Sequence, residues 1–185
     1  PDRRIRLRIN TLIDGQPICE VDFSANHLRL NLAVIAGEDA GDTPYEDIGE
    51  LAGDIERQRI KMYTTIAMGS SSRDDARGAC YREGISNSLF DVIEAAVLKR
   101  YPKVGLYTGL GVNAQSLEGQ ILKHVMLEGV EQGIVALPVH DAVAVTQDNA
   151  DWAKEAMLRA WFELANSGGG VARSRAKVDC PVTSY

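Results

Sequence analysis

The segment LPVHDAVAV, at residues 137–145, carries an aspartate in the middle of an apolar run. A continuous strand would put the Asp141 carboxylate on the same face as Val139 and Val143, among apolar side chains. A tight turn at His140 and Asp141 avoids this cost, because it leaves two short apolar strands with the carboxylate at their tip. The segment therefore predicts a β-hairpin and, with it, an antiparallel sheet.

A second hairpin is predicted near the start of the chain, and it carries two more acids. Apolar residues alternate with arginine at residues 5–9, an Asp-Gly pair follows at 14–15, and a second run extends from Pro17 to Phe23. This order is typical of two strands joined by a tight turn. Within the second run, strand periodicity puts Glu20 and Asp22 on one face, while Cys19, Val21 and Phe23 face the other way.

Carboxylates on a strand that otherwise belongs to the core need water, hydrogen bonds or a cation to compensate their charge. If the tip of the 137–145 hairpin approaches Asp22, two acids from distant parts of the chain converge, and divalent ions relieve their repulsion. Oxygen ligands of this kind suit Mg²⁺ or Mn²⁺ rather than zinc. The alternative is that Asp22 caps the next helix while Asp141 makes only a turn hydrogen bond.

The rest of the sequence has helical spacing. Ser24 offers an N-cap for a first helix, which Gly37 ends. Apolar spacing predicts further helices at about 45–67, 73–82, 86–100, 113–131 and 148–165, and a last strand at 171–178. We therefore expect a single α+β domain over residues 1–185, in which long helices pack on a small antiparallel sheet.

The composition excludes several classes of protein. Of the 185 residues, 45% are hydrophobic and 25% charged, which fits one folded core rather than a disordered chain. No apolar run approaches the roughly 18 residues of a membrane span. Three cysteines lie far apart in the sequence without a CxxC pair, which argues against a zinc knuckle or a disulfide framework. We expect a protein of a reducing cytoplasm, either complete or part of a longer chain.

Charge is distributed unevenly, although the net charge is −6. Residues 38–56 hold eight acids and no Lys or Arg, whereas residues 57–103 hold nine bases against five acids. The second segment predicts a basic face that holds a phosphate-bearing ligand, and the alternative is a solvated helix surface.

One candidate for phosphate binding lies in the basic segment. Arg57, Lys61 and Thr65 are spaced i, i+4 and i+8, so they line one face of the predicted helix. Arg as a bidentate fork, Lys as a point charge and a hydroxyl suit a triphosphate. The alternative is that Asp54 and Glu56 hold these cations in surface ion pairs.

In this order the segments resemble the palm motifs of family A DNA polymerases. VDFSANHLR at residues 21–29 looks like the first motif, and the Arg57-x-x-x-Lys61 pair resembles the second, on the fingers helix. Asn113-Ala114-Gln115 resembles the family's Asn and Gln beside template and primer, and the 137–141 segment looks like the third motif, Val-His-Asp.

The resemblance implies a palm-like sheet with reduced fingers at about 45–110 and no thumb. It implies template-directed nucleotidyl transfer by a DNA-directed DNA polymerase, with primer-template DNA and nucleoside triphosphates as partners. Asp22 and Asp141 would hold two Mg²⁺ or Mn²⁺ ions, and Lys61 would donate a proton to the leaving group. The resemblance implies that Arg57 and Lys61 contact the triphosphate and that Arg29, Asn113 and Gln115 support the substrate strands. Together with Thr65 from the helix spacing, and with His27 and His140 of the first and third segments, these are the candidate substrate-binding residues.

The sequence also departs from the family pattern. His27 stands where the family has a glutamate beside the sugar, and Ala142 stands where a second acid follows the His-Asp pair. The chain resembles the reduced polymerase-like proteins of phages and mobile elements, in a bacterial or phage-infected cytoplasm, with further domains or replisome proteins as partners. Two alternatives stay open: a degenerate palm that binds nucleic acid without turnover, and a metal-dependent nuclease.

Overall fold

The computed structural model describes residues 11–109 and 111–180, with the side chains of 111–113 left aside. The fold is α+β, as predicted, with a small antiparallel sheet and seven α-helices among the described residues. The predicted strand at residues 5–9 lies outside the described residues. Where the sequence predicts one domain, the chain divides into two compact units, a sheet unit (1–24, 118–164 and 174–185) and a helical unit (25–117 and 165–173).

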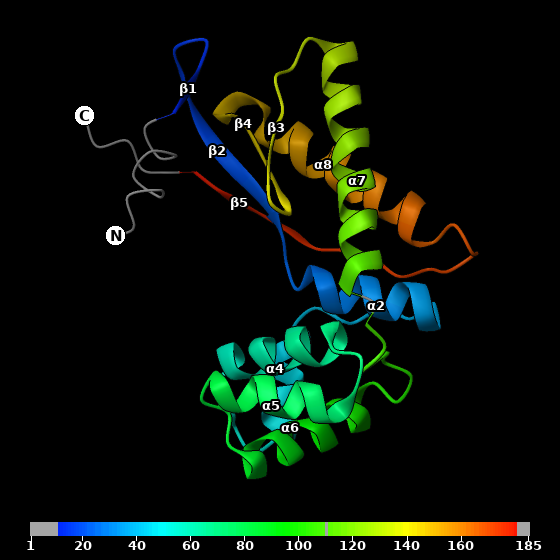
Figure 1. Cartoon of the computed structure of the whole chain (residues 1–185). Coiled ribbons are helices and arrows are strands. Elements are labelled where there is room, and N and C mark those ends of the chain that lie inside the picture. The colour runs from blue at the N-terminus through cyan, green and yellow to red at the C-terminus, as the bar shows by residue number, and fades with distance from the viewer. Residues whose placement is uncertain (1–10, 110, 181–185) are drawn as a thin grey trace. The chain divides into compact units, whose positions relative to one another are not determined.

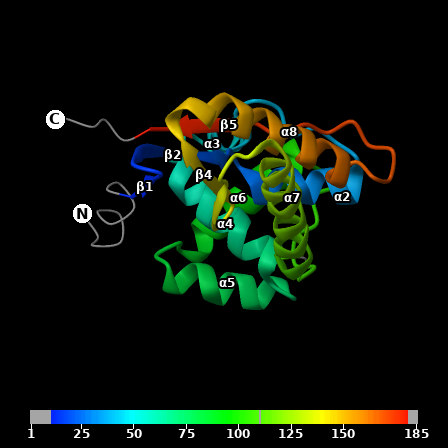
Figure 2. The ribbon, with the colours of Figure 1, turned by 90° about the horizontal axis from the view of Figure 1, so that it is seen from above.

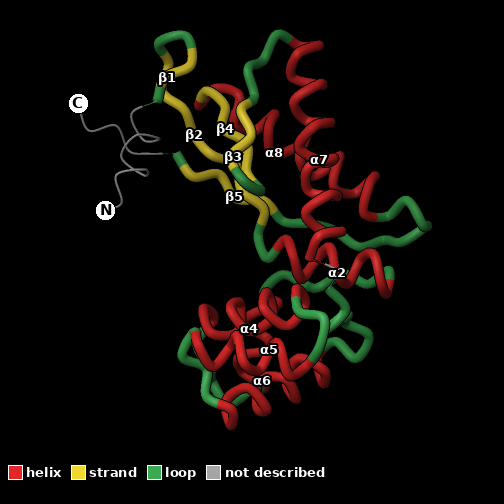
Figure 3. Tube along the Cα trace, in the orientation of Figure 1, coloured by secondary structure: helices red, strands yellow, loops and turns green. Residues whose placement is uncertain are grey.

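The sheet consists of β1 (Leu12–Ile13), β2 (Gln16–Phe23), β3 (Leu137–Val139), β4 (Ala142–Thr146) and β5 (Ala176–Asp179). Its order is β1-β2-β4-β3, and β5 pairs with β2 on the side away from β4. All pairs are antiparallel (Figure 3). The last strand is shorter than the predicted 171–178 and begins later. Strand β2 is thus the centre of the sheet, with β5 alongside it in Figures 1 and 2.

Both predicted tight turns are confirmed. Asp14 and Gly15 join β1 to β2 with φ of 51° and 77°, the left-handed values that a two-residue hairpin turn requires. His140 has φ of 56° in the turn between β3 and β4. Asp141 therefore lies at the tip of this hairpin, between two short strands.

Two long helices complete the sheet unit. Helix α7 (Gly111–Gln132) enters it from residue 118 onward, and α8 (Ala150–Ala165) follows a short 3-10 turn at Gln147–Asn149. An ion pair of 2.7 Å from Arg159 to Glu128 joins the two helices. Their inward side chains are fully buried and include Ile121, Val125, Ala153, Ala156, Met157 and Trp161.

The helical unit contains α2 (Asn26–Ala36), α3 (Pro44–Leu51), α4 (Arg57–Gly69), α5 (Arg73–Arg82) and α6 (Asn87–Arg100). One core holds these helices together, and its largest buried side chains include Leu28, Leu32, Tyr45, Ile48, Ile60, Tyr63, Phe90 and Ile93. Serine side chains cap α5 and α6, at Ser72 and Ser86.

The structure corrects two predictions in this unit. The single helix predicted at 45–67 is two helices, α3 and α4, because Gly53 and Asp54 adopt left-handed φ values of 89° and 62°. Ile48 and Ile60 lie in one core on either side of this break, which explains the continuous apolar spacing. Ser24 is not the N-cap of α2, since Ala25 occupies that position with φ of 54°.

Among the described residues, no helix combines the length and apolar character that crossing a bilayer requires.

Candidate active site

Strand pairing brings the backbone of the two predicted acids close together. In the register of β2 and β4, Asp22 lies directly opposite Ala142, the residue after Asp141. Opposed Cα atoms lie about 4.5–5.5 Å apart and consecutive ones 3.8 Å apart, so the Asp22 and Asp141 Cα atoms are within about 9 Å. Two acids 119 positions apart in the sequence are thus neighbours at one end of the sheet.

The pairing also defines the face on which Asp22 lies. Directly opposed residues of an antiparallel pair share a face, so Asp22 lies with Ala142 on one side and Lys177 on the other. Glu20 lies on the same face, two residues earlier, opposite Asp179. The predicted acidic face of β2 is therefore confirmed.

Lys177 compensates part of the charge on this face. Its Nζ atom lies 3.8 Å from Oδ2 of Asp22, whose side chain is 35% exposed. The Oδ1 atom of Asp22 is buried. Lys177 is 65% exposed and the distance is long, so solvent screens the ion pair and its contribution to stability is small.

The alternative roles proposed for the two acids find little support. Asp22 does not occupy the N-cap position of α2, which is Ala25. Within the described part of the chain, the Asp141 side chain makes no hydrogen bond or ion pair. Asp141 is half-buried and next to the exposed His140 at the hairpin tip.

The ligand atoms offered by Asp22 and Asp141 limit which metal ions could bind here. Two carboxylates provide oxygen ligands of the kind that Mg²⁺ and Mn²⁺ prefer. Among the described residues, no group of three or more His, Cys, Asp or Glu side chains is placed to hold a metal ion. A cation held by Asp22 and Asp141 alone would need water or phosphate oxygens at its remaining positions.

The predicted triphosphate residues lie on α4, in the helical unit. The Arg57 Nε atom makes an ion pair of 2.9 Å with Glu46 of α3, and its guanidinium lies 5.2 Å from the centre of the Tyr45 ring. The predicted alternative partners, Asp54 and Glu56, are not used in this way. Lys61 is exposed and makes no ion pair within the described residues.

Three of the predicted substrate-binding residues share a cavity in the helical unit. His27 of α2, Thr65 of α4 and Gln115 of α7 line a pocket of about 240 Å³. The remaining lining is mainly apolar and includes Leu30, Val34, Ile35, Met68 and Leu117. Among the described residues, no Asp, Glu, Lys or Arg side chain lines it, so the cavity suits a neutral and largely apolar group rather than a phosphate.

Arg29 has a different environment. It is 1% exposed, and its guanidinium donates hydrogen bonds to the carbonyl oxygens of Gly41 at 2.8 Å and Asp42 at 3.2 Å. The side chain thus holds the loop between α2 and α3. Contact with a substrate strand would require this loop to move. The side chain of Asn113 lies outside the described residues.

Three ion pairs join the acidic segment to the basic one. Lys103 pairs with Glu38 at 2.8 Å and Arg100 pairs with Asp47 at 3.0 Å, in addition to Arg57 with Glu46. The predicted basic face is therefore smaller than the sequence indicates. Four of its nine bases make no ion pair within the described residues: Arg59, Lys61, Arg82 and Lys99.

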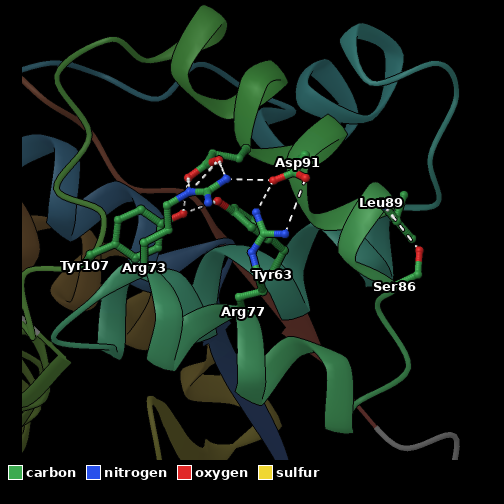
Figure 4. A network of polar contacts seen from close by, with 8 residues as sticks. Tyr63, Arg73, Arg77, Ser86, Leu89, Asp91 and Tyr107 are labelled. Atoms are coloured by element: carbon green, nitrogen blue, oxygen red, sulfur yellow. Dashed lines mark hydrogen bonds and ion pairs between the residues drawn. The ribbon is translucent and has the colours of Figure 1, made fainter.

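A polar network between α4, α5 and α6 was not predicted from the sequence (Figure 4). Arg73 donates two hydrogen bonds to Glu94 from its Nε atom, at 2.8 and 3.0 Å, and Arg77 pairs with Asp91. The Tyr107 hydroxyl donates to Glu94 at 2.5 Å and meets the Tyr63 hydroxyl at 2.8 Å. The two arginines and the two acids pair with one another, so the network joins α5 to α6.

Two sequence spacings could have indicated this network. Arg73 and Arg77 are four residues apart on α5, while Asp91 and Glu94 are three apart on α6. Each pair therefore shares one helix face, and the two faces are complementary in charge.

Comparison with known proteins identifies no relative. No protein-family model matches the sequence, and no curated protein matches it either.

Proposed function

We propose that this chain performs template-directed nucleotidyl transfer on DNA, in the manner of a minimal family A polymerase palm. The observation that carries the proposal is the strand register that makes Asp22 and Asp141 neighbours at one end of the sheet. The order of the motifs along the sequence supports it independently.

The chain's own residues would divide the work between binding and charge compensation. Asp22 and Asp141 would hold Mg²⁺ or Mn²⁺, and bound ions would supply activation of the primer hydroxyl and neutralisation of phosphate charge. Lys61, which is exposed and makes no ion pair within the described residues, would hold the triphosphate and give a proton to the leaving pyrophosphate. Arg57 would contact the same phosphates by exchanging Glu46 for them.

The cavity of the helical unit would accept a neutral part of the substrate. His27, Thr65 and Gln115 offer hydrogen bonds at its wall, and the apolar side chains exclude water. These three residues belong to three different helices, so the cavity depends on how the helical unit folds. Because none of its described lining residues is Asp, Glu, Lys or Arg, we expect the phosphates to bind on another surface.

The test is labelled-primer extension with Mg²⁺ and with Mn²⁺, in parallel with deoxy- and ribonucleotides. We expect Asp22→Asn and Asp141→Asn each to reduce extension by at least about 100-fold, because each removes one of two charged ligands. Asp148→Asn is the matched control, since Asp148 is exposed in the 3-10 turn after β4. Equal extension by all four proteins would rule out the assignment of the carboxylates.

Two observations favour a second candidate, a degenerate palm that binds DNA without turnover. Ala142 lies opposite Asp22 where the family has a second acid, and Lys177 already offers a cation to Asp22. This candidate predicts primer-template binding that persists in Asp141→Asn, with no extension by the unmodified chain. Release of nucleotides from DNA without added triphosphates would instead indicate a nuclease.

A further inference from the structure

Strand pairing brings together two cysteines that are far apart in the sequence. Strand β5 pairs with β2 so that Phe23 lies opposite Ala176 and Glu20 lies opposite Asp179. One further step along the same ladder puts Cys19 opposite Cys180. The wide spacing of the cysteines in the sequence conceals this relation.

The geometry of this position suits a covalent bond. Directly opposed residues in an antiparallel ladder have Cα atoms about 4.5–5.5 Å apart, within the range of about 4.4–6.8 Å found for disulfides. The two side chains also interact directly: burial, and then hydrogen bonding and charge interaction with Cys180, raise the pKa of the Cys19 thiol to about 12. Both residues are free thiols, Cys19 fully buried and Cys180 exposed.

We propose that Cys19 and Cys180 form a redox-sensitive pair, which closes to a cross-strand disulfide by exchange with a low-molecular-weight disulfide such as oxidised glutathione. The exposed Cys180 thiolate attacks one sulfur of the small disulfide, releases one small thiol and leaves a mixed disulfide on Cys180. The Cys19 sulfur loses its proton to water, attacks the Cys180 sulfur and displaces the second small thiol. Two protein thiols are oxidised, and one small disulfide is reduced to two thiols.

The bond would fasten the C-terminal strand to the centre of the sheet. It would lie three ladder positions from the pair formed by Asp22 and Lys177, and would tie β5 beside that pair. Since the disulfide closes nearly the whole chain into a loop, it removes conformations from the unfolded state. The oxidised sheet unit is therefore expected to resist unfolding more than the reduced one.

The experiment uses the full chain equilibrated with oxidised and reduced glutathione at several ratios, alkylated and digested for mass spectrometry. We expect two of the three thiols to become protected, with a Cys19–Cys180 linkage and a mass lower by two hydrogens. Cys80→Ala, which removes the buried thiol of α5, should retain the linkage, whereas Cys180→Ser should abolish it.

A second readout follows the consequence for folding. Trp152 and Trp161 both belong to the sheet unit, so their fluorescence reports urea unfolding of that unit. The oxidised chain should unfold at a higher urea concentration than the reduced chain, and dithiothreitol should reverse the shift. Three free thiols at every glutathione ratio, a linkage to Cys80, or disulfides found only between two chains would each overturn the proposal.

Discussion

Replacing Gly49 by alanine should destabilise the helical unit, although the change favours helix formation in general. Gly49 lies in the last turn of α3, and a Cβ atom there would be only 2.5 Å from the carbonyl oxygen of Ile55. The same two residues share a backbone hydrogen bond, in which Ile55 N–H donates to the Gly49 carbonyl at 3.1 Å. The Cγ1 atom of Ile60 would lie 3.8 Å from the same Cβ atom.

The magnitude follows from three contributions. Overpacking against a backbone atom costs about 2 kcal/mol, and the weakened hydrogen bond adds about 1 kcal/mol. The gain in helix propensity from Gly to Ala offsets about 1 kcal/mol. The net loss in the free energy of unfolding is about 2 kcal/mol, which lowers the urea midpoint by about 1 M for an m-value of about 2 kcal/mol/M.

The assay is urea unfolding followed by far-UV circular dichroism, with Gly78→Ala as the matched control. Gly78 lies inside α5, and its nearest neighbour is the flexible end of Arg82 at 3.6 Å, so alanine fits there. This control should gain about 0.5–1 kcal/mol. If Gly49→Ala unfolds at the same urea concentration as the unmodified chain or a higher one, the close approach of α3 to Ile55 is wrong.

Three further predictions test the helix contacts and the carboxylate site. Hydrogen bonding from Arg73 lowers the pKa of Glu94 in the folded protein. The ionised carboxylate therefore stabilises the fold at pH values above its unfolded-state pKa of about 4.3, and this stabilisation is lost as the pH falls. Glu94→Gln should accordingly flatten the dependence of thermal stability on pH between about 5 and 3. Phe90→Ala should cost about 3–5 kcal/mol in urea unfolding, because the buried ring packs edge-on against Tyr63 at 5.0 Å and lies beneath Arg73 and Arg77. Lys177→Gln should change stability by less than about 1 kcal/mol, since solvent screens the pair of this exposed lysine with Asp22. The same change should tighten Mn²⁺ binding measured by electron paramagnetic resonance, and unchanged binding would count against Asp22 as a ligand.

The parts of the fold that were predictable are those whose local chemistry has one solution. The Asp14-Gly15 pair requires a left-handed turn, and an aspartate within the apolar 137–145 segment requires a bend. The α3–α4 break was not predictable, because Ile48 and Ile60 keep helical spacing while belonging to different helices. Apolar spacing reports which residues enter the core, and it does not report whether one helix carries them.

The candidate site was also predictable only in part. Strand alternation alone puts Glu20 and Asp22 on one face, but only the register of β2 with β4 brings Asp141 to them. The charges follow the same rule. The sequence shows an acidic segment followed by a basic one, but only tertiary packing shows that Glu46, Asp47 and Glu38 form ion pairs with Arg57, Arg100 and Lys103. A Lys or Arg side chain is available to a ligand only if it does not already form an ion pair within the protein. On this reasoning Lys61, which keeps no such partner within the described residues, is a stronger candidate for phosphate than Arg57.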